Sequence, residues 1–277
     1  KVLEWIKTLD APHVYIIMTT RPAAIEDVRE DLRELGFDRG GASACVFRNR
    51  ERGLSCSVYG DDLATEGPTD HLDLSAGELR KAYGLTETAR SGPGPQDDEE
   101  GRILNRVVRW TPEGIEYEAD PRQGGKIVQD LGLGGCNTVA TPGAKTTFDQ
   151  TVSETPLEDA KLTPFRGIAA RANYLAADRP ELQFASKEIC RWMASPTETS
   201  VVALKRLARY IHVHKRQVFL YKWQDAEKIG VCADTDWAGC PRTRKSTSGG
   251  SVMLGCHTIK HWSSTQASVA LSSGEAE

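Results

Sequence analysis

The sequence predicts a mixed α/β fold, because strand-like segments alternate with amphipathic helices along a chain of 277 residues. In several stretches apolar residues recur every three or four positions, which is typical of helices with one buried face. Elsewhere, short apolar segments are separated by polar turns that contain glycine, which is typical of β-hairpins. The 13 Pro and 25 Gly interrupt these segments often, so the elements are expected to be short.

The first part of the chain is expected to form a helix followed by a hairpin. Apolar spacings of three and four predict a helix over residues 24–36. The segments Ala44–Arg48 and Leu54–Tyr59 are predicted to pair as strands across a polar turn. Because another apolar segment starts after Asp62, residues 59–62 are expected to form a tight connection between two extended segments.

The middle of the chain is expected to contain a helix over residues 71–88 and a loop over residues 90–101. Glycine, proline and a run of acids in that loop disfavour regular structure. A second hairpin is predicted from Val107–Trp110 and Ile115–Tyr117. Asp120, which precedes a proline, has the character of an N-cap residue that begins another helix.

The following helix contains two adjacent glycines, Gly124 and Gly125. Each costs about 1 kcal/mol relative to alanine, so this helix is expected to be weak. A polar linker interrupted by proline is predicted over residues 137–160. Two later helices are predicted to begin at capping-box patterns, Asp178–Glu181 and Ser195–Glu198, each with a proline inside the start.

From Lys228 onward the pattern changes from helices to short apolar segments separated by turn residues. Three successive antiparallel strands are therefore predicted, at Lys228–Asp234, Gly250–Leu254 and Thr258–Trp262.

Charge is divided unevenly along the chain, although the formal net charge is only −4. Residues 1–160 hold 18 Lys and Arg against 29 Asp and Glu, whereas residues 161–225 hold 12 against 5. The basic stretch predicts either a face that binds a polyanion or an ordinary solvated helix surface, and charge alone does not choose between them. The candidate nucleic-acid-binding residues are the cations around its last helix: Lys205, Arg206, Arg209, Lys215 and Arg216.

Composition also argues against several classes of protein. Seven cysteines, an odd number without a CxxC pair, disfavour a disulfide framework or a zinc ribbon and favour reduced thiols. The sequence contains no window of 18 apolar residues, so no membrane span is predicted. The start of the chain also lacks the pattern of a signal peptide. We therefore expect an intracellular protein that has no membrane partner.

The sharpest chemical signal is the sequence Tyr59-Gly60-Asp61-Asp62, which ends an apolar strand. Two neighbouring carboxylates repel each other, and a divalent cation removes that cost. Gly60 permits the backbone angles of a tight turn. Paired carboxylates of this kind can hold the Mg²⁺ ions of two-metal phosphoryl transfer. The alternative is a solvated turn without a ligand.

Residues 35–67, LGFDRGGASACVFRNRERGLSCSVYGDDLATEG, closely resemble the palm of reverse transcriptases from copia-type LTR retrotransposons, including a Y-x-D-D-L box. The resemblance implies that Asp61 and Asp62 are catalytic and bind Mg²⁺ or Mn²⁺, with Asp61 the stronger ligand. The resemblance continues along the chain. Residues 103–110 are similar to the primer grip of the family, residues 120–133 and 140–143 to its thumb, and residues 164–211 to the helices that follow.

Residues 233–277 resemble the opening of the ribonuclease H domain of the same family, with DTDWAG, RKSTSG, IKHWSS and SSGEAE in the family's order. By position, the resemblance implies that Asp234 and Glu277 are its catalytic, metal-binding acids. Asp236 is expected to be a turn carboxylate, and Glu275 is the residue most easily confused with Glu277.

The resemblance implies a reverse-transcriptase palm and thumb remnant over residues 1–136 and a linker with a basic helical connection over 137–225. The first three strands of a ribonuclease H-like fold would follow over 226–277. The parent activity would be RNA-directed DNA synthesis with hydrolysis of RNA in RNA–DNA hybrids. Its partners would be an RNA template, a DNA primer, the hybrid and deoxynucleoside triphosphates, in a cytoplasmic particle or the nucleus.

This sequence departs from the family in its acids. The third palm carboxylate has only Asp10 as a nearby candidate, and two further ribonuclease H acids have no match. We therefore expect the chain to be inactive in isolation. Two alternatives stay open, a non-catalytic nucleic-acid-binding relic and a fragment of an RNA-dependent RNA polymerase. The latter also uses Gly-Asp-Asp but carries no ribonuclease H segment.

Overall fold

The computed structural model describes residues 14–19, 30, 32–41, 43–60, 62–83, 85–144, 155–225, 227–240 and 242–277. By packing, the chain divides into two units. The first runs to Tyr117 and includes Val218–Lys228 and Leu254–His257, and the second comprises Glu118–Gln217, Ile229–Met253 and Thr258–Glu277. The functional division at residues 136 and 225 stays a prediction, since packing does not test it.

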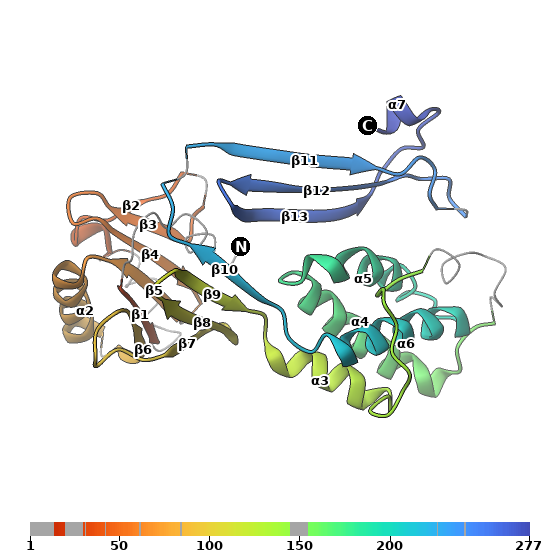
Figure 1. The fold of residues 1–277 in the computed structure, drawn as a ribbon, viewed down its shortest axis with the longest axis horizontal. Helices are drawn as coiled ribbons and strands as arrows, with labels where there is room; N and C mark the ends of the chain where they lie inside the picture. The colour runs from red at the N-terminus through yellow and green to blue at the C-terminus, as the bar shows by residue number, and fades with distance from the viewer. Residues whose placement is uncertain are drawn as a thin grey trace. The chain divides into compact units, whose positions relative to one another are not determined.

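The first unit contains an antiparallel sheet with the strand order β2-β3-β4-β5-β1-β6 (Figure 1). The strands are β1 (Val14–Thr19), β2 (Asp38–Arg39), β3 (Val46–Asn49), β4 (Leu54–Tyr59), β5 (Asp62–Gly67) and β6 (Thr86–Ser91). The predicted hairpin is confirmed, because β3 pairs with β4 in antiparallel register. The extended segment after Asp62 is also confirmed, because β4 pairs with β5.

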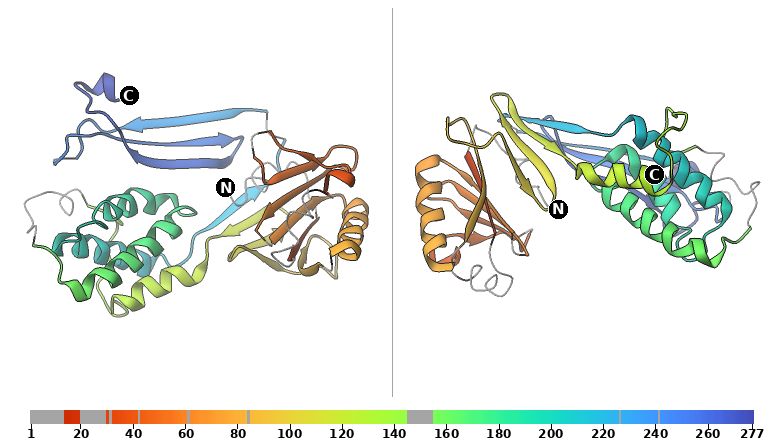
Figure 2. Two further views of the ribbon diagram at one scale, coloured as in Figure 1. Left: turned by 180° about the vertical axis from the view of Figure 1, so that it is seen from behind. Right: turned by 90° about the horizontal axis from the view of Figure 1, so that it is seen from below.

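Helix α2 (Thr69–Tyr83) covers one face of this sheet (Figure 2). Its buried residues Leu72, Ala76 and Leu79 recur at helical spacing and join the core that contains Leu54 and Val58 of β4. The expectation that this helix continues to residue 88 is wrong, because Thr86–Ser91 forms β6 beside β1. Pairing with a strand from the start of the chain outweighs the local helical pattern there.

Only part of the helix predicted over residues 24–36 can be compared with the structure. Residues 30 and 32–34 are helical, Leu32 is buried, and the chain turns at Gly36, whose φ is +81°. The remainder, residues 24–29 and 31, lies outside the described residues.

A second sheet in the first unit has the order β10-β9-β8-β7. Its strands are β7 (Glu100–Ile103), β8 (Arg106–Thr111), β9 (Gly114–Glu118) and β10 (Val218–Lys222). The hairpin of β8 and β9 is confirmed, but the predicted loop shortens to residues 92–99. Gly114 is required beside β10, because a Cβ there would lie 2.1 Å from the carbonyl oxygen of Tyr221.

The second unit contains a helical core whose buried residues come mainly from α3, α4, α5 and α6. These are α3 (Pro121–Asp130), α4 (Asp159–Ala176) and, after the short 3₁₀ helix η4 (Pro180–Leu182), α5 (Gln183–Cys190) and α6 (Glu198–Val213). Many of the buried residues are small, including Ala169, Ala172, Ala203 and Ala208, so the helix axes can approach closely.

The two predicted capping boxes are wrong in position. At the first, the chain enters η4 through Arg179, whose side chain makes no cap bond with the described residues. At the second, the N-cap is Thr197, which forms a capping box with Ser200. Pro196 precedes this cap, so the proline lies outside the helix.

The last segment of the second unit is a sheet in the order β11-β12-β13, followed by α7 (Ser273–Ala276). The strands are β11 (Ile229–Thr235), β12 (Thr247–Leu254) and β13 (His257–Thr265), and their arrows alternate in direction (Figure 1). The predicted strands and their order are confirmed. A Cβ at Gly250 would lie 2.4 Å from the Trp262 ring, so the glycine makes room for this side chain.

The predicted N-cap at Asp120 is confirmed, and its carboxylate is nearly inaccessible to solvent. The carboxylate accepts hydrogen bonds from the backbone N–H and the guanidinium of Arg122 and from the amide of Gln123. Burial opposes the charged form, but the bonds from Arg122 and Gln123 outweigh burial and lower the pKa of Asp120 from 3.8 to about 2.

We predict that Asp120→Ala lowers the free energy of unfolding by about 1–2 kcal/mol near neutral pH, because the cap of α3 is lost. A lowered folded-state pKa stabilises the fold above the ordinary pKa of 3.8, and this contribution is lost as the pH falls toward 2. The difference in the free energy of unfolding between variant and wild type, measured in urea, should therefore disappear as the pH falls over this range. Glu158→Ala is the control, since the side chain of Glu158 makes no cap hydrogen bond to the described part of α4 and its ion pair with Lys161 is exposed to solvent. A gap that is independent of pH would contradict the prediction.

The glycine pair of α3 yields a second prediction. A Cβ at Gly124 would lie 3.0 Å from Cγ2 of the buried Ile211 on α6, whereas a Cβ at Gly125 meets nothing within 4 Å. Gly125→Ala should raise the free energy of unfolding by about 0.5–1 kcal/mol through helix propensity. Gly124→Ala should lower it by about 1 kcal/mol, because overpacking outweighs the same gain. Equal effects in chemical denaturation would show that α3 does not pack against α6 in this way.

Candidate functional site

The Tyr59–Asp62 segment lies where β4 turns into β5. Tyr59 pairs with Asp62, so only two residues separate the paired positions. Gly60 has a φ of +60°, and a Cβ built on it meets nothing within 4 Å. There is therefore open space beside Gly60, and its backbone conformation favours glycine. The predicted tight turn is confirmed.

The structure describes one of the two acids of this turn. Asp62 is half-buried at the first position of β5, whereas Asp61 lies outside the described residues. Carboxylate oxygens at an open turn suit Mg²⁺, which prefers oxygen ligands and keeps several waters. Throughout the described part of the chain, however, no group of three or more His, Cys, Asp or Glu is placed to hold a metal ion. Asp10, the candidate third palm carboxylate, also lies outside the described residues.

A second acid pair in the same unit, Asp97–Asp98, lies in a different environment. Asp97 accepts hydrogen bonds from the guanidinium of Arg90 at 2.9 Å and from the backbone N–H of Gly94 at 2.7 Å. Asp98 accepts one from the backbone N–H of Arg90 at 2.8 Å. These bonds compensate the negative charges without a metal, so the pair is a structural counterpart to the pair at the turn.

Asp234 lies near the end of β11 and is exposed, and its carboxylate accepts a hydrogen bond from the N–H of Thr235 at 2.9 Å. Glu277 directly follows α7. Both views place α7 beyond the end of β11 (Figures 1 and 2). The fold thus brings the two elements that carry these acids to the same end of the sheet.

The competing acids of this segment have structural roles. Asp236 accepts a hydrogen bond from the N–H of Thr247 at 2.5 Å, which confirms the expectation of a turn carboxylate. Glu275 accepts one from the N–H of Leu271 at 2.7 Å and so closes the turn before α7. Glu277 therefore stays the candidate acid of this helix.

Three of the five predicted nucleic-acid-binding residues are bonded to other parts of the chain, so they are less available to a ligand than the sequence implies. Arg206 donates to the Thr141 hydroxyl at 2.8 Å, and Arg209 donates to the carbonyl oxygen of Asn137 at 2.5 Å. Helix α6 ends at Val213, so Lys215 and Arg216 lie beyond it. Arg216 forms a bidentate ion pair with the buried Glu118, at 2.6 and 2.7 Å. Of the five, Lys205 and Lys215 are exposed without such a contact in the described residues.

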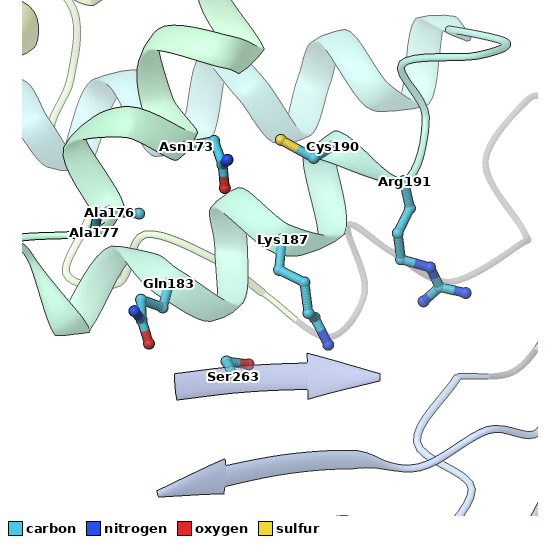
Figure 3. Close-up of a pocket in the computed structure, with 8 residues that line it drawn as sticks. All are labelled: Asn173, Ala176, Ala177, Gln183, Lys187, Cys190, Arg191 and Ser263. Atoms are coloured by element: carbon cyan, nitrogen blue, oxygen red, sulfur yellow. The ribbon is translucent and has the colours of Figure 1, made fainter. Parts of the chain in front are cut away.

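Sequence reasoning missed a cleft of about 500 Å³ in the second unit (Figure 3). It is lined by residues of α4 and α5 and by Ser263 of β13: Asn173, Ala176, Ala177, Gln183, Lys187, Cys190, Arg191 and Ser263. Gln183, Lys187 and Arg191 are spaced by four, so they form one stripe along α5. That spacing, inside the basic stretch, is the signal that could have predicted the cleft wall.

The cations of the cleft are held in a defined network. Lys187 Nζ donates to the Thr247 hydroxyl at 2.9 Å and lies 2.8 Å from a carboxylate oxygen of Glu188. Arg191 pairs with the other carboxylate oxygen at 2.9 Å and donates to Cys240 Sγ at 3.1 Å. Burial raises the pKa of the Cys240 thiol, but hydrogen bonds from Thr243 and Arg191 outweigh burial and lower the pKa to about 7.

No protein-family model matches this chain. An uncharacterized mitochondrial protein of Arabidopsis thaliana is 30% identical over 224 residues, which are 79% of this chain and 87% of that protein. Retrovirus-related Pol polyproteins from transposons RE1 and RE2 of the same plant are 36% and 37% identical over 139 residues, half of this chain. The chain belongs to the retrotransposon Pol polyprotein family.

The matched segment covers 9% of each of the two transposon polyproteins. None of the helices in the described residues has the length and apolarity that crossing a membrane requires.

We predict that Arg216→Gln lowers the free energy of unfolding by about 1.5–3 kcal/mol, since it removes the two charged hydrogen bonds that Arg216 donates to the buried carboxylate of Glu118. The effect should fall near the lower value, because the side chain of Arg216 is 60% exposed. Lys215→Gln, which removes the same charge from the neighbouring exposed position, should change stability little. Equal losses in thermal unfolding would mean that net charge is responsible rather than the ion pair.

Proposed function

We propose that this chain is the part of a copia-type retrotransposon Pol polyprotein in which a reverse transcriptase continues into a ribonuclease H. The observation that carries the proposal is the glycine-containing turn between β4 and β5, with adjacent acids at Asp61 and Asp62. Membership of the Pol polyprotein family supports it. The parent reaction would join deoxynucleotides to a DNA primer on an RNA template and hydrolyse the RNA of the resulting hybrid.

In this proposal, Asp61 and Asp62 would hold Mg²⁺ or Mn²⁺ in the polymerase, and Asp234 and Glu277 would do so in the ribonuclease H segment. The ions would supply positive charge that stabilises the attacking and leaving oxygens of phosphoryl transfer. The pairing of Tyr59 with Asp62 would hold the polymerase acids at the turn. The order β11-β12-β13 would hold Asp234 at one end of its sheet.

The isolated chain is proposed to extend no primer and to cut no hybrid. Two-metal catalysis needs more carboxylate ligands than Asp61 and Asp62, or Asp234 and Glu277, supply in either segment. Magnesium-dependent primer extension that disappears in Asp61→Asn would overturn this part of the proposal.

A metal titration tests the proposal without relying on activity. Mn²⁺ added to the full chain should broaden the amide NMR signals of Gly60 and Leu63 first, because a paramagnetic ion at the turn relaxes nearby nuclei. The double variant Asp61→Asn, Asp62→Asn should abolish this broadening.

The matched control is Asp97→Asn, Asp98→Asn, which removes the other acid pair and should leave the broadening at the turn unchanged. If Mn²⁺ broadens signals near Asp97 and Asp98 as strongly as those at the turn, any acid pair suffices. The metal-site proposal would then be wrong.

A further inference from the structure

We propose that the cleft between α5 and β13 binds the sugar-phosphate backbone of a nucleic acid. The inference rests on the proposed function and names a contact surface that the charge pattern of α6 did not indicate. In Figure 3, Lys187 and Gln183 extend from α5 toward the strand that carries Ser263. The two walls of the cleft thus present polar side chains to the same space.

The charge of the cleft suits an anion of low charge. Lys187 and Arg191 share one buried carboxylate, Glu188, so the cations of the lining are only half compensated. Arg242 adds a further cation nearby, with its guanidinium 4.6 Å from the centre of the Trp192 ring. A phosphodiester carries a single negative charge, which matches this modest excess better than the several charges of a triphosphate.

The neutral polar groups suit a sugar. Asn173 and Gln183 each offer a donor and an acceptor, and Ser263 offers a hydroxyl that can do both. Such groups hydrogen-bond to ribose hydroxyls and to phosphate oxygens without reading a base. Ala176 and Ala177 contribute only small side chains to the lining, which leaves space for a backbone to approach.

The cations of the cleft are oriented before any ligand binds. The bonds from Lys187 to Thr247 and from Arg191 to Cys240 join α5 to the segment of β12 and its preceding turn. Arg206, Arg209 and Arg216 are bonded within the chain as well. The proposal assigns nucleic-acid contact to α5 because Lys187 and Arg191 line the cleft together with Gln183 and Ser263.

The test changes the charge of the cleft in both directions at one position. Gln183→Lys should add a phosphate contact, and Gln183→Glu should repel the backbone. Fluorescence anisotropy with a labelled RNA–DNA hybrid should show about five- to tenfold tighter and weaker binding, respectively, near 0.1 M salt. The slope of log affinity against log salt should be steeper by about 0.9 in the lysine variant.

The matched controls are Gln129→Lys and Gln129→Glu, which place the same charges on the exposed face of α3. Their effects on affinity should be smaller than twofold. If the Gln129 and Gln183 pairs act equally, the field of the whole chain governs binding and the cleft assignment is wrong. A loss of folding cannot produce tighter binding in one variant and weaker binding in the other. If either variant loses its cooperative melting transition, Ser263→Lys and Ser263→Asp repeat the test from the opposite wall.

Unlabelled competitors show whether the cleft binds a nucleic-acid backbone or the phosphates of a free nucleotide. Unlabelled hybrid should displace the probe, and double-stranded DNA should do so more weakly if the sugar hydroxyls contribute. Displacement by deoxynucleoside triphosphate at equal phosphate concentration would overturn the proposal in favour of a nucleotide site. If the wild-type chain does not bind hybrid but still binds Mn²⁺ at the Tyr59–Asp62 turn, the cleft inference fails while the proposed function stands.

Discussion

The arrangement of the second unit depends on the burial of one side of α5. Ala185 and Ile189 of α5 are almost completely inaccessible and belong to the helical core, as does Leu182, which directly precedes the helix. Positions two residues before or after them point to the opposite side of the helix, since each residue turns the helix by about 100°. Core packing therefore turns the stripe of Gln183, Lys187 and Arg191 away from the core and into the cleft. The polar side of α5 therefore faces the cleft because the apolar side is buried in the core.

A similar dependence holds for the turn between β4 and β5. Cys56, Val58 and Leu63 are fully buried, so the two strands are anchored up to the turn that follows Tyr59. Burial is also the main reason that the pKa of the Cys56 thiol is raised to about 11, despite a hydrogen bond with Thr65. A slip of one residue would move these apolar side chains to the other face of the sheet. The hydrophobic register thus sets where the acidic turn lies.

The sequence-based errors share one physical origin. The helix expected to reach residue 88 ends earlier because β6 pairs with β1, about 70 residues away in sequence. The helix expected to be capped at Ser195 starts after Thr197 instead, where residues 155–157 bind the chain: the N–H of Glu198 donates to the carbonyl oxygen of Thr155 at 3.1 Å, and the N–H of Leu157 donates to that of Pro196 at 2.9 Å. Arg206 and Arg209 of α6 bind the segment at residues 137–141, and Arg216, which follows the helix, binds Glu118. In each case a partner that is distant in sequence outweighs a local preference.

Much of the fold and the acidic turn could be predicted from the sequence alone, because both follow from local patterns. Short apolar segments bounded by turn residues predicted the hairpins and the strands of the last sheet, and the Gly-Asp-Asp motif predicted a tight turn between strands. The sequence could not show which cations remain available, since an arginine in a basic stretch has no visible partner until the chain folds. Only the tertiary structure decided that Arg216 is bound to Glu118 and that Lys187 and Arg191 line a cleft with Ser263. These residues are roughly 70 to 100 positions apart in sequence, and local periodicity carries no information about such pairs.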